Sequence, residues 1–132
     1  MDGFGVGTAY RFRARSHAVR EARHAALAFA HQHDIPDEKL DGIALAVSEA
    51  TTNVILHAYR DRDAPGTFTL ELDIEAGSLL IDVRDDGVGM SPRDDSPGMG
   101  FGLPLIARVC DAHGFVPTEG GGTWLAMRFD LD

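Results

Sequence analysis

The sequence is poor in residues that several common protein chemistries require. Cys110 is the only cysteine among 132 residues, so an internal disulfide is excluded and a reducing cytoplasm is the expected location. Lys39 is the only lysine among the twelve basic residues, and its setting, Asp-Glu-Lys-Leu, is typical of an exposed helix start. Lysine catalysis and a Walker-type phosphate-binding lysine are therefore not expected. No apolar run approaches the roughly 18 residues of a membrane span.

Positive charge is also scarce. Twelve Lys and Arg residues stand against 21 Asp and Glu residues, which gives a formal net charge of −9. This balance argues against a direct nucleic-acid surface and against binding to an anionic membrane. The hydrophobic fraction of 44% is enough for one core at this length. We therefore expect a single domain over residues 1–132, in which residues 1–7 form a flexible, glycine-studded leader rather than a signal peptide.

Hydrophobic periodicity predicts an alternation of strands and helices. A strand is expected over residues 8–14, and a helix over 17–33 with Ser16 as its N-cap, ended by Asp34-Ile35-Pro36. The further expected elements are a long helix over 37–58, a hairpin of strands 67–75 and 79–84, an irregular segment 85–100, a helix over 101–112 and a last hairpin of strands 115–118 and 123–130. This order predicts an α+β fold, with three helices on one face of a mixed, mostly antiparallel sheet.

The expected helix over 37–58 carries a polar stripe beside its core stripe. Glu49, Asn53 and His57 recur every four residues, and Gly42 and Ala46 share their sector of the helix. A stripe that is polar at one end and sterically empty at the other could line a ligand cleft, although a solvated face with a stray small residue is the simpler interpretation of the stripe alone. An amide oxygen suits Mg²⁺, and a carboxylate can take a proton from an attacking hydroxyl. For His57 we prefer a packed ring or a partner of the helix dipole to a catalytic role.

Two glycine-containing segments follow. Asp85, Gly87 and Gly89 come directly after a predicted buried strand, where a carboxylate can accept a hydrogen bond from an exocyclic amine and glycines allow close approach to a flat ring. A plain Asp-Gly turn is the alternative. Downstream, Gly98, Gly100 and Gly102 precede a helix, an arrangement that can present backbone N–H groups to phosphate. The spacing matches neither a Rossmann fingerprint nor a P-loop.

These segments in this order resemble the histidine-kinase-like (GHKL, Bergerat-fold) ATPase family. Glu49 to Asn53 corresponds to its N box, Asp85 to Gly89 to its G1 box and Gly98 to Gly102 to its G2 box. The stretch from Ala46 to Tyr59 is similar to the anti-sigma-factor serine kinase branch. The resemblance covers residues 8–130.

The resemblance implies a role for each matching residue. Asp85 would bind the adenine amino group, assisted by Thr123. Asn53 would hold Mg²⁺ on the phosphates of ATP, and Glu49 would be the general base toward a serine hydroxyl. The phosphates would be clasped by Gly98, Gly100 and Gly102, with residues 90–99 as the ATP lid. Arg93 is the candidate for a phosphate contact in that lid, with an exposed loop arginine as the alternative.

The expected function is therefore that of an ATP-binding anti-sigma factor with serine/threonine protein kinase activity. It would bind a sigma factor and phosphorylate a small antagonist protein. A non-catalytic, nucleotide-dependent binding module is the alternative, whereas a sensor histidine kinase would need a dimerisation hairpin with a phospho-acceptor histidine. We also expect the first strand and first helix to mediate a homodimer or present a partner surface.

Overall fold

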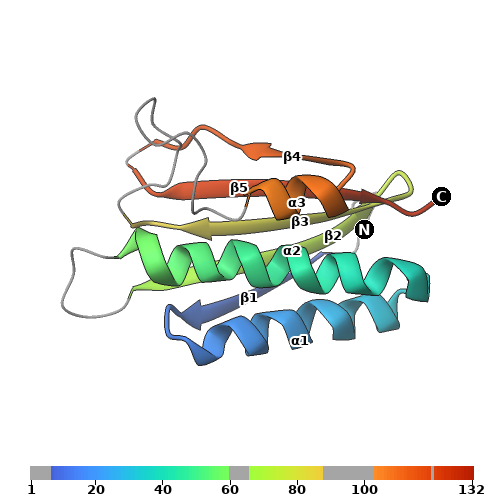
Figure 1. Cartoon of the computed structure of the whole chain (residues 1–132), viewed down its shortest axis with the longest axis horizontal. Helices are drawn as coiled ribbons and strands as arrows, with labels where there is room; N and C mark the ends of the chain where they lie inside the picture. The colour runs from blue at the N-terminus through green and yellow to red at the C-terminus, as the bar shows by residue number, and fades with distance from the viewer. Residues whose placement is uncertain (1–6, 60–65, 88–102, 120) are drawn as a thin grey trace.

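The computed structural model describes residues 7–59, 66–87, 103–119 and 121–132. Its elements in chain order are β1 (Thr8–Arg13), α1 (His17–Gln32), a 3-10 turn (Asp37–Lys39), α2 (Leu40–Asn53), a π-helical turn (Val54–Ala58), β2 (Thr67–Glu75), β3 (Ser78–Asp85), α3 (Leu103–Val109), β4 (Ala112–Phe115) and β5 (Thr123–Asp130). Most expected elements are present at close to their expected bounds (Figure 1). Among these residues no helix is both long and apolar enough to cross a membrane.

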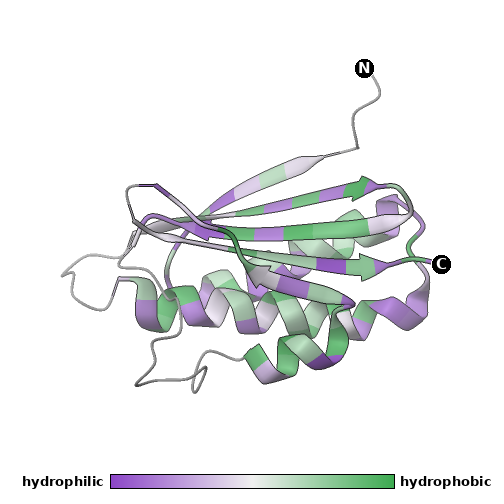
Figure 2. Cartoon of the chain, turned by 90° about the horizontal axis from the view of Figure 1, so that it is seen from above, coloured by the Kyte–Doolittle hydropathy of each residue, from purple (hydrophilic) through white to green (hydrophobic). Residues whose placement is uncertain are grey.

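The strands form a five-stranded sheet in the order β1-β2-β3-β5-β4. Each neighbouring pair among the described strands is antiparallel. The three helices lie together in front of the sheet in Figure 1, and α2 lies between α1 and α3. The view in Figure 2 shows α2 and α3 below the strands. The expected α+β architecture, with helices on one face of the sheet, is confirmed.

The core lies between this sheet and the helices. Every second residue of β2, β3 and β5 is buried, which is the period of a strand with one covered face. Large side chains from both layers are fully buried, among them Phe29, Ile43, Phe68, Leu70, Ile81 and Ile106. Full burial of one such side chain is worth about 1.5–3 kcal/mol before the entropy cost of ordering it. The alternation therefore determines which face of each strand meets the helices.

Local sequence explains how two of the connections are made. Ala76 and Gly77 have φ angles of 51° and 81°, and they form the two-residue turn between the paired residues Glu75 and Ser78. Positive φ at both central residues is typical of a type I′ hairpin turn. At the end of α1, Asp34 also has a positive φ of 55°. The N–H of Ile35 donates to the carbonyl of Ala30 at 3.0 Å, which is the bond pattern of a Schellman C-cap.

Two expected helix features are present in position but differ in their local geometry. Ser16 precedes α1, but its backbone is helical and its side chain makes no capping hydrogen bond. The helix expected over 37–58 spans these residues, but it is not α-helical throughout: a 3-10 turn begins it and a π-helical turn ends it. Near the change of geometry, the Thr51 hydroxyl donates to the carbonyl of Val47 at 2.7 Å. A hydroxyl bonded to the carbonyl four residues earlier competes with the helical ladder and bends a helix.

The first strand of the last hairpin begins earlier in the chain than the sequence predicts. It spans Ala112–Phe115 rather than 115–118, although it pairs with β5 as expected. The ladder begins early because the N–H of Asp111 donates to the carbonyl of Arg128 at 2.9 Å. It ends at Val116, because Pro117 has no N–H to continue it. α3 correspondingly ends at Val109 rather than at residue 112.

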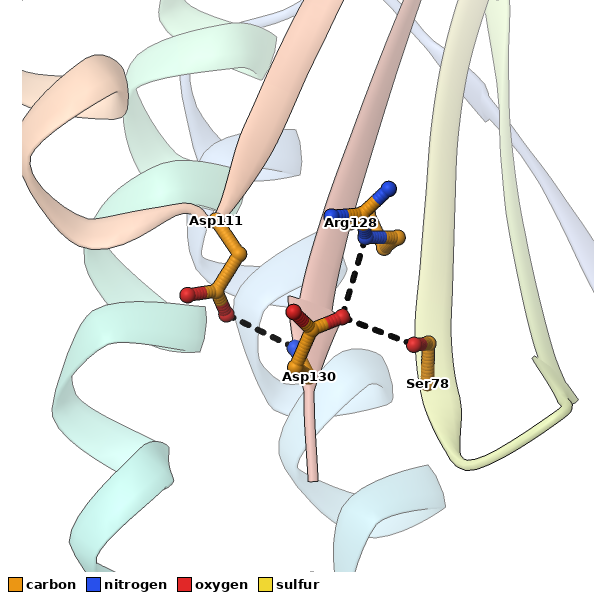
Figure 3. Close-up of polar contacts among 4 residues, drawn as sticks. All are labelled: Ser78, Asp111, Arg128 and Asp130. Atoms are coloured by element: carbon orange, nitrogen blue, oxygen red, sulfur yellow. Dashed lines mark hydrogen bonds and ion pairs between the residues drawn. The ribbon is translucent and has the colours of Figure 1, made fainter. Parts of the chain in front are cut away.

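Polar contacts fix the C-terminal end of β5, at Asp130 (Figure 3). The Asp111 carboxylate accepts the backbone N–H of Asp130 at 2.7 Å. One carboxylate oxygen of Asp130 accepts the Ser78 hydroxyl at 2.8 Å and the Arg128 Nε at 2.9 Å. The hydrogen bond from Ser78, which has the largest effect, and that from Arg128 lower the pKa of Asp130. The strands β3 and β5 are thereby held in register from this end.

Candidate functional site

Asp85 is the last residue of β3, opposite Thr123, the first residue of β5. The two oxygens of its half-buried carboxylate differ in their hydrogen bonding. Oδ1 accepts the backbone N–H of Gly87 at 2.9 Å, whereas Oδ2 is buried and has no hydrogen-bond partner among the described residues. Burial is the main cause that raises the pKa of Asp85, and the backbone N–H groups of Gly87 and Thr123 oppose the rise. Oδ2 is thus a buried acceptor with no donor within hydrogen-bond distance among the described residues.

Glycine is required on both sides of this carboxylate. A Cβ at Gly87 would lie 2.1 Å from the carbonyl oxygen of Ala58. A Cβ at Gly122 would lie 2.2 Å from the carbonyl oxygen of Asp85, and Gly122 has a φ of +85°, a backbone conformation that other residues adopt at a cost. The sequence identified Gly87 as a close-approach position. The structure shows that the approach is to the backbone at the end of the π-helical turn.

Asn53 and Thr123 line one small enclosed cavity between α2 and the sheet. Ala50, Val54, Val83, Phe115 and Leu125 complete its lining. Asn53 is 6% exposed and Thr123 is 4% exposed, and burial of polar groups of this kind is costly unless they are hydrogen-bonded. Since Thr123 pairs with Asp85 across β3 and β5, the fold brings three of the predicted site residues together from distant parts of the chain.

Glu49 lies on α2 one turn before Asn53 and is half-buried. A carboxylate at that distance along a helix shares a face with the amide, as the sequence predicts. His57 falls within the π-helical turn and is half-buried. The regular spacing from Glu49 through Asn53 to His57 therefore does not continue as an α-helical stripe.

The small residues of this sector have a different role from the predicted one. Ala46 is fully buried, and a Cβ at Gly42 would lie 3.3 Å from the Cβ of Val109. Gly42 thus allows α2 to pack closely against α3, and it does not line a ligand cleft. The error arises because a small residue at a helix surface looks the same in sequence whether a ligand or a neighbouring helix covers it.

Several predicted site residues lie outside the described part of the chain. These are Gly89, Arg93, Gly98, Gly100 and Gly102, together with residues 90–99 that we expected to form an ATP lid.

The described residues fit a nucleotide better than a protein-held metal centre. Among them, no three His, Cys, Asp or Glu side chains converge as a metal site. Mg²⁺ commonly takes few protein ligands and completes its shell with phosphate oxygens and water. One amide, that of Asn53, is compatible with this mode of binding. The unpartnered Oδ2 of Asp85 is in turn compatible with an amino-group donor on a ligand.

Sequence reasoning assigned no role to Tyr59. Its hydroxyl donates to Oδ1 of Asp86 at 2.6 Å and also lies within hydrogen-bond distance of the Thr67 carbonyl. A tyrosine directly after a helix gives no sign of such a contact, because Asp86 is far away in the sequence. The adjacent Asp85 and Asp86 were visible as a motif, but their partner was not.

Comparisons with known proteins identify the family of the chain. The model of the histidine kinase-like ATPase domain matches residues 12–129. The anti-sigma F factor of Clostridium novyi (strain NT) is 33% identical over 131 residues, which are 91% of each chain. That of Clostridium acetobutylicum is 32% identical over 129 residues and 89% of each chain, and that of Geobacillus stearothermophilus is 36% identical over 104 residues, 69% of this chain and 70% of the relative.

The fold also matches a solved structure. The crystal structure of the RsbU and RsbW domains of Rv1364c from Mycobacterium tuberculosis superposes with a TM-score of 0.75 at 17% sequence identity. The match covers 96% of this chain but only 32% of that longer one, so the chain spans about a third of its length. At this identity the similarity concerns the fold alone. The family model and the relatives together show that this chain belongs to the histidine kinase-like ATPase family, in the branch that includes the anti-sigma F factors.

Proposed function

We propose that the protein is an ATP-binding anti-sigma factor with protein-serine/threonine kinase activity. The observation that carries the nucleotide assignment is the buried Oδ2 of Asp85, which has no hydrogen-bond partner among the described residues. An adenine amino group supplies the donor that this oxygen lacks. The similarity to anti-sigma F factors over nine-tenths of the chain supports the anti-sigma role.

In the proposed reaction, Asp85 and Thr123 bind the adenine base, while Asn53 contributes an oxygen ligand to Mg²⁺. The ion, when bound, neutralises charge on the phosphates. Backbone N–H groups at Gly98, Gly100 and Gly102 bind the phosphates, and Arg93 adds a further phosphate contact. Gly87 and Gly89 let the backbone approach the adenine ring closely. These donors explain how a protein of net charge −9 can bind a polyanion.

Glu49 is the proposed general base. Its carboxylate accepts the proton of a serine hydroxyl on the partner as the hydroxyl oxygen attacks the γ-phosphorus. The new O–P bond forms on the serine, the bond between the γ-phosphorus and the bridging oxygen breaks, and ADP leaves. A base positioned in this way contributes about 10²–10⁴ in rate.

The proposed partners are a sigma factor and a small antagonist protein that carries the serine. The names of the relatives, anti-sigma F factors, support the first of these. The proposed location is the cytoplasm, where a regulator of a sigma factor acts. A chain with one cysteine has no internal disulfide that a reducing compartment would break. A homodimer through the edge strand β1 is the proposed assembly, since β1 lies at the edge of the sheet.

The kinase proposal is tested with Glu49→Gln. Labelled ATP is incubated with small proteins encoded beside this one, and ATP affinity is measured by calorimetry. Glu49→Gln should bind ATP nearly as the wild type does, whereas phosphoryl transfer should fall by about 10²–10⁴. Asn53→Ala should weaken binding and transfer together, because the metal loses a ligand. Glu38→Gln, at an exposed glutamate in the 3-10 turn, is the matched control and should change neither quantity.

The outcomes separate the proposal from its alternatives. Transfer by Glu49→Gln at the wild-type rate contradicts the general-base role. A wild-type protein that binds ATP and its partners but never transfers phosphate is a non-catalytic, nucleotide-dependent binding module. A wild-type protein that does not bind ATP overturns the whole proposal.

A further inference from the structure

Tyr59 joins the end of the π-helical turn to the segment that carries Asp85. Its hydroxyl donates to Oδ1 of Asp86 at 2.6 Å and accepts the backbone N–H of Asp86 at 3.3 Å. The carbonyl of Thr67, at the start of β2, lies within reach of the same hydroxyl proton. One side chain therefore contacts both the side chain and the backbone of the residue next to Asp85.

The ring of Tyr59 is also fixed in place. It is 6% exposed, and a Cβ at Gly66 would lie 2.2 Å from its Cε1. Glycine at position 66 thus leaves room for the ring at the start of β2. Burial, and then the hydrogen bond to Asp86, raise the pKa of Tyr59 to about 12. The hydroxyl consequently keeps its proton throughout the neutral range and remains a donor.

A second contact lies one residue earlier. Gly87 approaches the backbone of Ala58 so closely that a Cβ at position 87 would lie 2.1 Å from the Ala58 carbonyl oxygen. The N–H of Gly87 donates to Oδ1 of Asp85. Ala58 therefore contacts Gly87, whose N–H orients one oxygen of the Asp85 carboxylate. Tyr59 contacts Asp86, which lies between Asp85 and Gly87 in the chain. Both Ala58 and Tyr59 come from the end of the π-helical turn.

We propose that Tyr59 is a positioning residue for adenine recognition, which holds Asp86, and through it the adjoining Asp85 and Gly87, so that Oδ2 of Asp85 is aimed at the amino group of the base. This inference rests on the proposed function, because it concerns the same nucleotide site. It adds a specificity role for a residue that does not itself contact the ligand. Without the hydroxyl, the segment of residues 85–87 loses its side-chain anchor, and the carboxylate can turn away from the base.

The test compares ATP with inosine triphosphate, in which a carbonyl oxygen replaces the 6-amino group. Tyr59→Phe keeps the ring against Gly66 and removes the hydroxyl. We expect its dissociation constant for ATP to rise about tenfold, which corresponds to about 1.4 kcal/mol, and that for inosine triphosphate to stay within about twofold. Tyr10→Phe is the matched control at the other tyrosine, and should change neither constant. Urea unfolding of each variant checks that the fold is retained.

A second variant keeps the inference open to refutation if Tyr59→Phe unfolds. Asp86 is exposed, so Asp86→Ala should fold and should reduce the preference for ATP in the same way. In the double variant the second change should add less than about twofold, because both remove one interaction. Equal weakening of both nucleotides, or an unchanged preference for ATP, overturns the positioning role while leaving the proposed function intact. A wild-type protein with no preference for ATP overturns the adenine assignment itself.

Discussion

The carboxylate of Asp85 is a single group in which folding and ligand binding have opposite requirements. Its Oδ2 is buried without a donor among the described residues, and burial raises its pKa. An anionic group in such a position destabilises the ligand-free fold. A bound donor removes that cost. The same atom therefore makes the ligand-free protein less stable and, in the proposed function, offers the amino group of the nucleotide an acceptor.

Asp85→Asn should separate these two effects. The amide keeps the shape but carries no charge, so we expect ATP binding to weaken by about 1–3 kcal/mol, the value of one hydrogen bond to a charged group. The ligand-free variant should unfold at the same urea concentration as the wild type or a higher one. Calorimetry with ATP and urea unfolding at neutral pH measure the two quantities. Unchanged affinity would contradict the adenine assignment. A clear loss of stability in the ligand-free variant would contradict the claim that the buried carboxylate destabilises the fold.

The pH dependence of stability follows from the raised pKa of Asp85. Since the folded-state pKa lies above the unfolded value of about 3.9, the protonated carboxyl favours the folded state. This contribution is complete below the unfolded pKa and is lost as the pH rises through the folded one. The stability gained by Asp85→Asn over the wild type should therefore be largest near pH 7 and should shrink as the pH falls toward about 4. Urea unfolding of both proteins across this range tests the direction, and a difference that grows on acidification would contradict it.

At the scale of the elements, the sheet and helix positions were largely predictable from the sequence. In β2 and β5 the alternation of apolar and polar residues is long and regular, and so is the apolar period of α1. In each of these elements one face is buried and the opposite face is more exposed. The failures occurred where a backbone contact decides the geometry. The π-helical turn lies near the hydrogen bond from the Thr51 hydroxyl to the Val47 carbonyl, and the early start of β4 coincides with the bond from the Asp111 N–H to Arg128. The periodicity of the apolar residues predicts neither bond.

The candidate site shows the same division. Asp85, Asn53 and Glu49 were predicted because their residue types and spacing carry chemistry. Tyr59 could not be, since its partner Asp86 is 27 residues away in the sequence. Gly42 was misread for a related reason. The residue that covers it, Val109, belongs to another helix.

Gly122→Ala tests whether the start of β5 is built around the backbone of Asp85. The added Cβ would lie 2.2 Å from the Asp85 carbonyl oxygen at a φ of +85°. We expect a loss of at least about 2 kcal/mol in the free energy of unfolding, with weaker ATP binding because β3 must shift. Gly114→Ala, in β4, is the matched control, since a Cβ there meets nothing within 4 Å. Equal stabilities of the two variants in urea would contradict the close approach.

At the scale of the whole molecule, β1 lies at one edge of the sheet, so one side of its backbone has no strand partner among the described residues. Thr8, Tyr10 and Phe12 face the core, whereas Ala9, Arg11 and Arg13 are exposed. An edge of this kind can pair with another strand, and charged side chains on it oppose such pairing. The two arginines therefore set the conditions under which the proposed homodimer can form.

The salt dependence of that homodimer can be predicted. A twofold pairing of two β1 edges brings Arg11 and Arg13 of one copy near the same residues of the other, because the strand has only six residues. Like charges at this distance repel, and salt screens them over about 10 Å at 0.1 M. Sedimentation at tens of micromolar protein should thus show more dimer at about 0.5 M than at about 0.05 M salt. Arg11→Gln should raise the dimer fraction at low salt, whereas the control Arg108→Gln, at an exposed residue of α3, should not. Monomer under every condition would contradict the homodimer, and a dimer that dissociates as salt is added would show that a surface other than the β1 edge forms it.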